Sequence, residues 1–312
     1  MQQLMVDFAV ILPISIGIGI LAAMTGISGG AFKTPILIIL FGISAEVAPA
    51  ASLFSALFVA IVAAADYYRR NPQLIEFRTG TVAMLATIPG SYIGISLKTI
   101  VAHAHLLQLA FGIFLFPVAV KMLFAQSSDM EHSNGQKSML RFSDLSKNRL
   151  AIAIISIFLA GVSAGLLGLG GGTIIVPVLC IILQFPILKA AATSMYTMIF
   201  TASAGSIINY AVLTSSVEMT AFLFFGIAMG IGMLIGGPIG TRYASKVNSA
   251  WLQRLFGFLL IFPLVKMMTL GQTWLDPGGT NYILATIGDA IIWVLIGIPI
   301  WFASSYRRGI KN

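Results

Sequence analysis

Charged side chains are scarce in this chain of 312 residues. Asp, Glu, Lys and Arg make up only 9% of the sequence, whereas 58% is hydrophobic and the mean hydropathy is +0.97. An ordinary soluble domain carries about 25% charged residues, which it needs to cover its surface. The shortage excludes such a domain and predicts that most of the chain faces lipid or other buried helices.

Cysteine and histidine are too few to build a metal centre. Cys180 is the single cysteine, which excludes a disulfide framework and a cysteine metal site. His103, His105 and His132 fall in predicted loops and form no cluster with ligand spacing. The glycine run that starts at Gly168 lacks the Lys-Ser/Thr ending of a phosphate-binding loop. We therefore expect neither a metal nor a cofactor.

Long apolar runs fill the rest of the chain. A run of about 20 apolar residues can cross a hydrocarbon core of about 30 Å. Two shorter apolar pieces, 35–41 and 177–183, each follow a glycine cluster and predict broken or re-entrant helices. The fold class we predict is an all-α integral membrane protein of about nine spans. These spans are 8–24, 49–65, 81–97, 106–124, 150–169, 190–213, 219–240, 252–270 and 282–302.

Glycine, proline, serine and tyrosine recur in one order at a separation of 142 positions. Such matches between two aliphatic segments do not arise from shared composition, so they predict an internal repeat. The pairs are Gly26 with Gly168, Gly29 with Gly171, Gly30 with Gly172, Pro35 with Pro177, Ser52 with Ser194, Tyr68 with Tyr210, Gly90 with Gly232 and Gly94 with Gly236.

The repeat suggests how the chain is divided. A polar stretch of mixed charge separates the two matched halves, and an additional apolar run with a basic tail follows the second half. We predict a first transmembrane repeat at 1–125, a cytoplasmic linker at 126–149, a second repeat at 150–270, and an extra helix with its tail at 271–312.

The basic residues favour inverted repeats, because Lys and Arg accumulate in short cytoplasmic loops. If each glycine-broken segment dips in and returns, an outside N-terminus leaves only Lys98 and Lys266 outside and Lys33 in the membrane. If each segment crosses fully, the repeats become parallel, and Arg242, Lys246 and the basic tail move outside. We therefore predict a multi-pass protein of the cell (inner) membrane with a cytoplasmic C-terminus.

The net charge of +8 raises the alternative of a nucleic-acid partner. Its basic residues flank apolar runs instead of forming a soluble face interleaved with aromatic residues. They are typical of topology signals, so we expect no nucleic acid and take the lipid bilayer as the surrounding partner.

The two glycine clusters are the first candidates for a binding site. Gly29 and Gly30 in one repeat, and Gly170, Gly171 and Gly172 in the other, can break a helix and bring the backbone close to a ligand. Non-helical backbone inside a membrane must be buried in protein or line a wet cavity. The half-helix that follows presents free N–H groups that favour an anion. The alternative is that these glycines only permit close helix packing.

Hydroxyl groups near the starts of two spans are the second candidates. Ser52 and Ser55 in the first repeat, and Thr193, Ser194 and Thr197 in the second, could donate hydrogen bonds to an oxyanion without a buried charge. The alternative is that each hydroxyl bonds a carbonyl of its own helix.

Three charged residues inside predicted spans complete the candidates. Lys33 follows the first cluster, where the second repeat has Ile175, and its ammonium could bind the anion. The alternative is a snorkelling or ion-paired lysine. Asp66 and Asp289 are weaker candidates for proton coupling, with a structural role as the alternative.

The second glycine cluster resembles a motif of the sulfite exporter TauE/SafE family. Gly168-Leu-Gly-Gly-Gly followed by Pro177-Val-Leu is similar to that family's G-x-G-G-G-x-x-x-x-P-x-L pattern, and the resemblance extends over 16–268. It implies a secondary transporter of the plasma membrane that moves sulfite, sulfoacetate or related organic anions, usually outward. The first repeat departs from the pattern at Ser28 and Lys33, and the final span is extra. These departures leave the anion open.

The function we predict is therefore export of a small anion by alternating access at a midplane site. The arguments from the two glycine clusters support a passive anion channel equally well. The flux through such a channel would be neither saturable nor stimulated by exchange. An intramembrane enzyme is disfavoured because no span carries paired carboxylates, a His/Asp pair or a Ser/Lys pair at helical spacing. A fourth alternative is a protein that only assembles with a partner and transports nothing. The two glycine-broken segments would then have no function. Coupling to protons or sodium and assembly as a homo-oligomer are left open.

Overall fold

The computed structural model describes residues 2–44, 46–100, 116, 119, 122, 142, 145–213, 215–267, 275 and 282–309. It divides into two compact units. The first comprises Met1–Ile100 and Lys137–Val247, and the second comprises Val101–Gln136 and Asn248–Asn312. Most of the predicted span 106–124 and most of the predicted linker lie outside the described residues. The predicted repeat boundaries stay a prediction.

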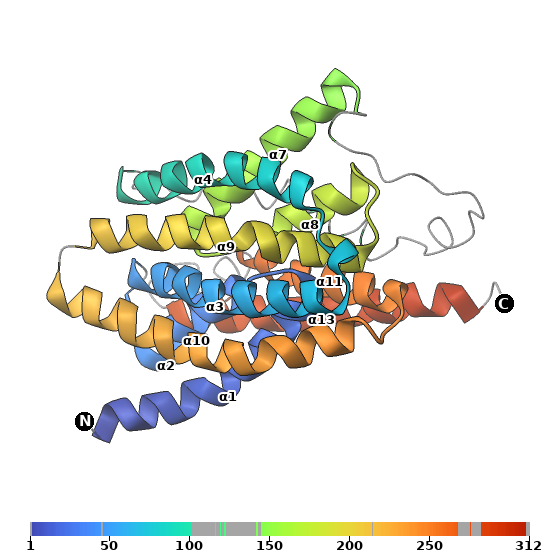
Figure 1. Cartoon of the computed structure of the whole chain (residues 1–312). Coiled ribbons are helices and arrows are strands. Elements are labelled where there is room, and N and C mark those ends of the chain that lie inside the picture. The colour runs from blue at the N-terminus through green and yellow to red at the C-terminus, as the bar shows by residue number, and fades with distance from the viewer. Residues whose placement is uncertain are drawn as a thin grey trace. The chain divides into compact units, whose positions relative to one another are not determined.

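The described residues form helices and no strand, which confirms the all-α prediction (Figure 1). Five helices, α1, α3, α4, α7 and α10, are long and apolar enough to cross a membrane, so the prediction of nine spans is confirmed in part. The first unit contains α1 (Gln2–Thr25), α2 (Gly30–Phe41), α3 (Val47–Arg70), η1 (Pro72–Leu74), α4 (Phe77–Ile100), α7 (Lys147–Leu167), α8 (Gly172–Ile181), α9 (Ile187–Val212) and α10 (Ser216–Ala244), and the second contains α11 (Ser249–Met267) and α13 (Tyr282–Gly309).

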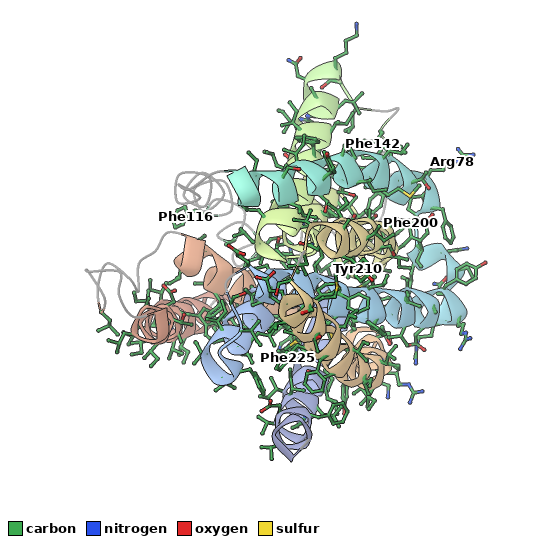
Figure 2. The ribbon with its side chains drawn as sticks, turned by 90° about the vertical axis from the view of Figure 1, so that its left-hand side faces the viewer. Arg78, Phe116, Phe142, Phe200, Tyr210 and Phe225 are labelled. Carbon is green, nitrogen blue, oxygen red and sulfur yellow. The ribbon has the colours of Figure 1, made fainter. Side chains whose placement is uncertain are left out.

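Apolar side chains cover the outer faces of these helices, as Figure 2 shows. Leu85 is 65% exposed, Ile207 is 69% exposed, and Tyr210, labelled in Figure 2, is 54% exposed. Large exposed apolar surface is costly in water and is typical of helices that face lipid.

The two short helices, α2 and α8, begin at glycines that adopt left-handed backbone angles. The residue before α2, Gly29, has φ 71°, and the residue before α8, Gly171, has φ 80°. A side chain with a Cβ disfavours this region, which explains why glycine stands there. The sequence pattern had placed the half-helices near Pro35 and Pro177, which is wrong by five residues, because the glycines and not the prolines set the helix starts.

The long helices of the first unit pack in pairs that join the two predicted repeats. α1 packs most extensively on α10, and α4 packs most extensively on α7. α3 contacts α9, and these two helices also contact α10 and α4 respectively. In terms of the predicted repeats, the first long helix of each repeat therefore packs on the third long helix of the other.

Glycine brings the backbones of α4 and α7 together. A Cβ on Gly90 would overlap the carbonyl oxygen of Phe158, and a Cβ on Gly94 would overlap that of Val162. Small residues at this spacing let membrane helices approach closely, so that dispersion contacts and backbone dipoles stabilise the pair.

The pair α1 and α10 repeats this contact. Gly236 and Gly240 of α10 face the carbonyl oxygens of Ile16 and Ile20, which lie 142 positions before the residues that α4 contacts on α7. The packing therefore equates the α4 glycines with Gly236 and Gly240, one helical turn later than the sequence match that began at Gly232. Glycine at every fourth position of α10 makes both registers fit the sequence, and only the packing separates them.

In the second unit, α11 packs on α13. Gly297 of α13 lies against the ring of Phe258, and the indole Nε1 of Trp293 donates to the Phe258 carbonyl oxygen at 3.1 Å. The aromatic ring of Trp293 also packs 4.9 Å from that of Phe258, measured between ring centroids. The small residue Gly297 and the hydrogen-bonded indole of Trp293 thus stabilise the packing of α13 on α11.

The close approach of α1 and α10 predicts a difference between two glycines. Gly236→Ala should destabilise the fold by about 1–3 kcal/mol, because the added methyl group meets backbone that must shift. Gly17→Ala on α1 is the matched control, since no atom lies within 4 Å of the added Cβ. Thermal unfolding in detergent, followed with a thiol-reactive dye at the buried and unique Cys180, measures both. An equal melting temperature for both variants would contradict the packing.

Candidate functional site

The two glycine turns lie against each other inside the first unit. Residues 26–30 and 168–172 run in opposite directions, so that Gly30 lies on the Gly168 carbonyl and Gly172 lies on the Gly26 carbonyl. A Cβ on either Gly30 or Gly172 would overlap the facing oxygen. We call this contact the crossing turns. It brings together all five glycines that the sequence analysis selected.

Serine hydroxyl groups hold the crossing turns in place. Ser194 Oγ donates to the Gly26 carbonyl oxygen at 2.9 Å, and Ser52 Oγ lies 3.4 Å from that of Gly168. Ser28 Oγ, in the middle of the first turn, donates to the Leu169 carbonyl oxygen at 2.6 Å. Each hydroxyl has a single hydrogen. In this arrangement Ser52 and Ser194 direct theirs at backbone carbonyls and therefore position the turns.

The crossing turns concentrate backbone N–H groups that have no acceptor among the described residues. A buried N–H group is nearly always paired with protein, water or a bound group. Several of these N–H groups also stand at the positive ends of α2 and α8. They are therefore candidate donors to a small anion. In the part of the chain that the structure describes, the N–H groups without a protein acceptor at this place belong to Ile27, Ser28, Gly29, Ala31, Leu169, Gly170, Gly171, Gly172 and Thr173, all of them buried.

Thr173 adds a side-chain donor that the sequence analysis missed. Its Oγ1 atom is fully buried and, among the described residues, makes no hydrogen bond. It is the second residue of α8. The signal was present in the sequence, because the first repeat has Ala31 at the matched position, so a hydroxyl stands directly after only one of the two glycine clusters.

Lys33 lies in the second turn of α2 and is fully buried. Its Nζ donates to the Ser52 carbonyl oxygen at 2.7 Å and to Ser55 Oγ at 2.8 Å, and lies 3.6 Å from Met233 Sδ. The structure thus brings together Lys33, Ser52 and Ser55, but it points the ammonium at α3. The snorkelling alternative is wrong, because the side chain does not reach the surface.

The two threonines face a different helix from Ser194. Thr193 Oγ1 accepts from the Glu76 backbone N–H at 3.1 Å, just before α4 begins. Thr197 Oγ1 donates to the Thr193 carbonyl oxygen at 3.0 Å, and lies 3.4 Å from the carbonyl oxygen of Gly80. These two predicted site residues therefore lie on the α4 side of α9 and not at the crossing turns.

Both acidic candidates lie elsewhere. Asp66, near the end of α3, forms an ion pair with Arg70 at 2.7 Å and accepts a hydrogen bond from Thr241 of α10. These contacts link α3 to α10, as expected if Asp66 has the structural role that was the alternative to proton coupling. Asp289 belongs to α13 in the second unit and is 4% exposed. A coupling role for either residue stays a prediction.

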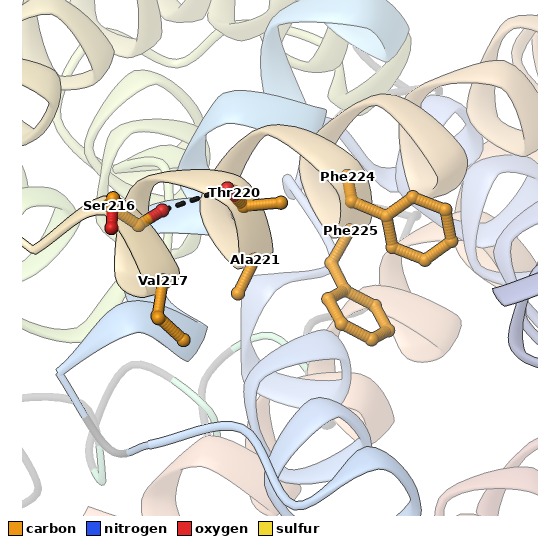
Figure 3. A pocket seen from close by; sticks show the side chains of 6 residues that line it. All are labelled: Ser216, Val217, Thr220, Ala221, Phe224 and Phe225. Atoms are coloured by element: carbon orange, nitrogen blue, oxygen red, sulfur yellow. Dashed lines mark hydrogen bonds between the residues drawn. The ribbon is translucent and has the colours of Figure 1, made fainter. Parts of the chain in front are cut away.

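An open pocket lies at the start of α10 (Figure 3). Ser216, Val217, Thr220, Phe224 and a few neighbours line it, and Thr220 Oγ1 donates to the Ser216 carbonyl oxygen at 2.8 Å. All of its lining residues belong to this one helix, none is charged, and none belongs to the crossing turns. Among the described residues, no group of His, Cys, Asp or Glu could hold a metal ion. The crossing turns are therefore the best candidate site.

The chain also resembles known proteins over most of its length. It is 21% identical over 269 residues to the "Probable membrane transporter protein YunE" of Bacillus subtilis (strain 168), which covers 82% of this chain and 95% of the relative. It is 27% identical over 251 residues to the "Probable membrane transporter protein MJ0441" of Methanocaldococcus jannaschii, which covers 78% of this chain and 86% of the relative. No solved structure matches the chain at a significant level.

A family model gives the most specific match. The model of the sulfite exporter TauE/SafE family matches residues 11–267, which include the crossing turns, most of α1 and every other helix of the first unit. This confirms the resemblance that the second glycine cluster carries. The chain belongs to the sulfite exporter TauE/SafE family and is a multi-pass membrane transporter.

Proposed function

We propose that the protein is a secondary active transporter that exports a small oxyanion, and that the crossing turns bind this anion. One observation carries the proposal: a cluster of buried backbone N–H groups, with the Thr173 hydroxyl beside them, has no acceptor in the described part of the protein. Lipid cannot satisfy such donors, whereas an oxyanion can accept several hydrogen bonds at once. Two helix N-termini add a favourable electrostatic potential.

The arrangement of the helices supports alternating access. Each turn rests on the carbonyls of the other, and the serines that hold them, Ser52 and Ser194, stand 142 positions apart. The glycine contacts of α4 on α7 recur in α10 on α1. A site shared by two matched halves can open to either side when one half tilts against the other. Inverted repeats are part of this proposal.

Sulfite and sulfoacetate are the substrates that family membership favours. Both have negatively charged sulfur-bound oxygens, and sulfoacetate has a carboxylate as well; all of these oxygens can accept hydrogen bonds from the donors of the crossing turns. The donor set contains nine backbone N–H groups and one hydroxyl, so it favours a compact oxyanion.

Transport by the purified protein tests the proposal. Proteoliposomes should take up at least one of radiolabelled sulfite, sulfate, sulfoacetate and acetate, with saturation and with stimulation by the same anion inside. The reason is that alternating access exchanges anions faster than it returns an empty site. Flux that is not saturable and is not stimulated from the opposite side would indicate a passive channel. No flux of any of the four anions would remove the proposal.

Thr173 should contribute to anion affinity. Thr173→Val keeps the side-chain volume but removes the donor, and should raise the KM for the transported anion by about tenfold to a hundredfold, since a hydrogen bond to a charged group is worth about 1.5–3 kcal/mol. Thr173→Ser should keep most of the affinity. Ser203→Ala is the matched control on α9, because Ser203 Oγ donates only to the Ile199 carbonyl oxygen. An unchanged KM in Thr173→Val would place the anion elsewhere.

The orientation in the membrane is tested by labelling. In a Cys180→Ser background, single cysteines at Gln3 and Asn312 should react differently with a membrane-impermeant thiol reagent. We expect Gln3→Cys to react in intact cells and Asn312→Cys to react only after permeabilisation, because the basic residues favour a cytoplasmic C-terminus. Labelling of both positions from outside would contradict the inverted arrangement.

A further inference from the structure

Lys33 is a buried amine whose surroundings are neutral. Its partners are the Ser52 carbonyl, the Ser55 hydroxyl and the Met233 thioether. The ion pairs of Arg70 with Asp66 and of Lys189 with Glu76 do not involve Lys33, and its partners among the described residues include no carboxylate. A buried ammonium without a counter-charge is costly, because these neutral acceptors replace its hydration only in part.

Helices that surround Lys33 keep their other ionisable groups near their ends. α1, α3 and α7 pack on α2, and α10 supplies Met233. Asp66 lies more than three turns beyond Ser52 on α3 and is engaged by Arg70 and Thr241. The ionisable side chains on these helices are Asp7 on α1, Asp66, Tyr67, Tyr68, Arg69 and Arg70 on α3, Lys147 and Arg149 on α7, and Glu218, Arg242 and Tyr243 on α10.

Ser52 connects Lys33 to the crossing turns. Its carbonyl oxygen accepts from the ammonium, and its hydroxyl faces the Gly168 carbonyl oxygen of the second turn. Lys33 also follows Ala31, whose N–H belongs to the donor cluster, by two residues on the same helix. A charge on Lys33 therefore acts on an anion at the crossing turns through buried protein, where electrostatic interactions are stronger than in water.

We propose that Lys33 carries a coupling proton, so that the anion and one proton cross the membrane together. This inference rests on the proposed function. The bound anion is the counter-charge that the ammonium lacks, and the ammonium stabilises the anion, so each binding event favours the other by the same factor. The amine lone pair accepts the proton from water on the loading side and returns it to water on the release side. A neutral amine still has N–H groups to donate to Ser52 and Ser55.

The second repeat has no equivalent of this amine. Ile175 occupies the matched position in α8 and is fully buried. Only one of the two turns therefore carries a titratable group, and the stoichiometry we expect is one proton for each anion.

The test compares Lys33→Arg and Lys33→Met with the wild-type protein in proteoliposomes that contain a pH-sensitive dye. Sulfate, sulfoacetate and sulfite serve as radiolabelled probes, and proton movement is corrected for the protonation of sulfite itself. In the wild type, an imposed pH gradient should drive accumulation of the transported anion, with about one proton moved for each anion. Lys33→Arg keeps a permanent charge, so anion exchange at equal pH should persist while accumulation driven by the pH gradient is lost. Lys33→Met should lose the gradient response too and raise the KM about tenfold or more.

The outcomes separate the two proposals. No flux of any probe through the wild-type protein removes the proposed function and this inference with it. Saturable flux without proton movement, or proton movement that persists in Lys33→Arg, overturns the role of Lys33 alone. Thermal unfolding followed at Cys180 shows whether each variant is folded, and Ser203→Ala serves as the control for flux.

Discussion

The contact between two glycine turns is the constraint on which the first unit depends. Gly30 and Gly172 have no room for a side chain, because the carbonyl of the opposite turn occupies the place of a Cβ. The chain can bring two non-helical segments this close only if both are glycine-rich and if neighbouring helices bind the freed carbonyls. Ser52 and Ser194 provide these hydrogen bonds. The remaining N–H groups of the turns are donors without a partner among the described residues, and the proposed anion site rests on this surplus.

The long helices provide the support that this contact requires. α1 and α7 end at the turns, and each is held along its length by glycines of a helix from the other half of the unit. The closeness of these backbones makes the pairs α1–α10 and α4–α7 stiff, so that each pair would move as a unit and carry the turn at its end with it. The same matching also relates Lys33 to Ile175, a charged residue to an aliphatic one. The difference between the halves, more than their similarity, is what could give transport a direction and a coupled ion.

Much of the fold could be predicted from residues whose meaning is local. The apolar runs predict helices in lipid, the glycine clusters predict helix breaks, and matched glycines and serines predict a duplication. The starts of α2 and α8 were misplaced because Pro35 and Pro177 are also compatible with a helix start, whereas the left-handed angles of Gly29 and Gly171 are seen only in three dimensions. The register of α10 was ambiguous for a similar reason, since its glycines recur once in each turn.

The sequence by itself determined that the chain is a helical membrane protein, that its helices break at two glycine clusters, and that it resembles the TauE/SafE family. These properties follow from composition and spacing, which act over one or two turns of chain. Only the tertiary structure decided which polar groups are already hydrogen-bonded within the protein. Ser52 and Ser194 bind backbone carbonyls, Thr193 and Thr197 face α4, and Thr173 is left as a free donor. The hydrogen-bond partner of a hydroxyl group cannot be predicted from the sequence, because it depends on which distant segment of the chain lies beside the hydroxyl group in the fold.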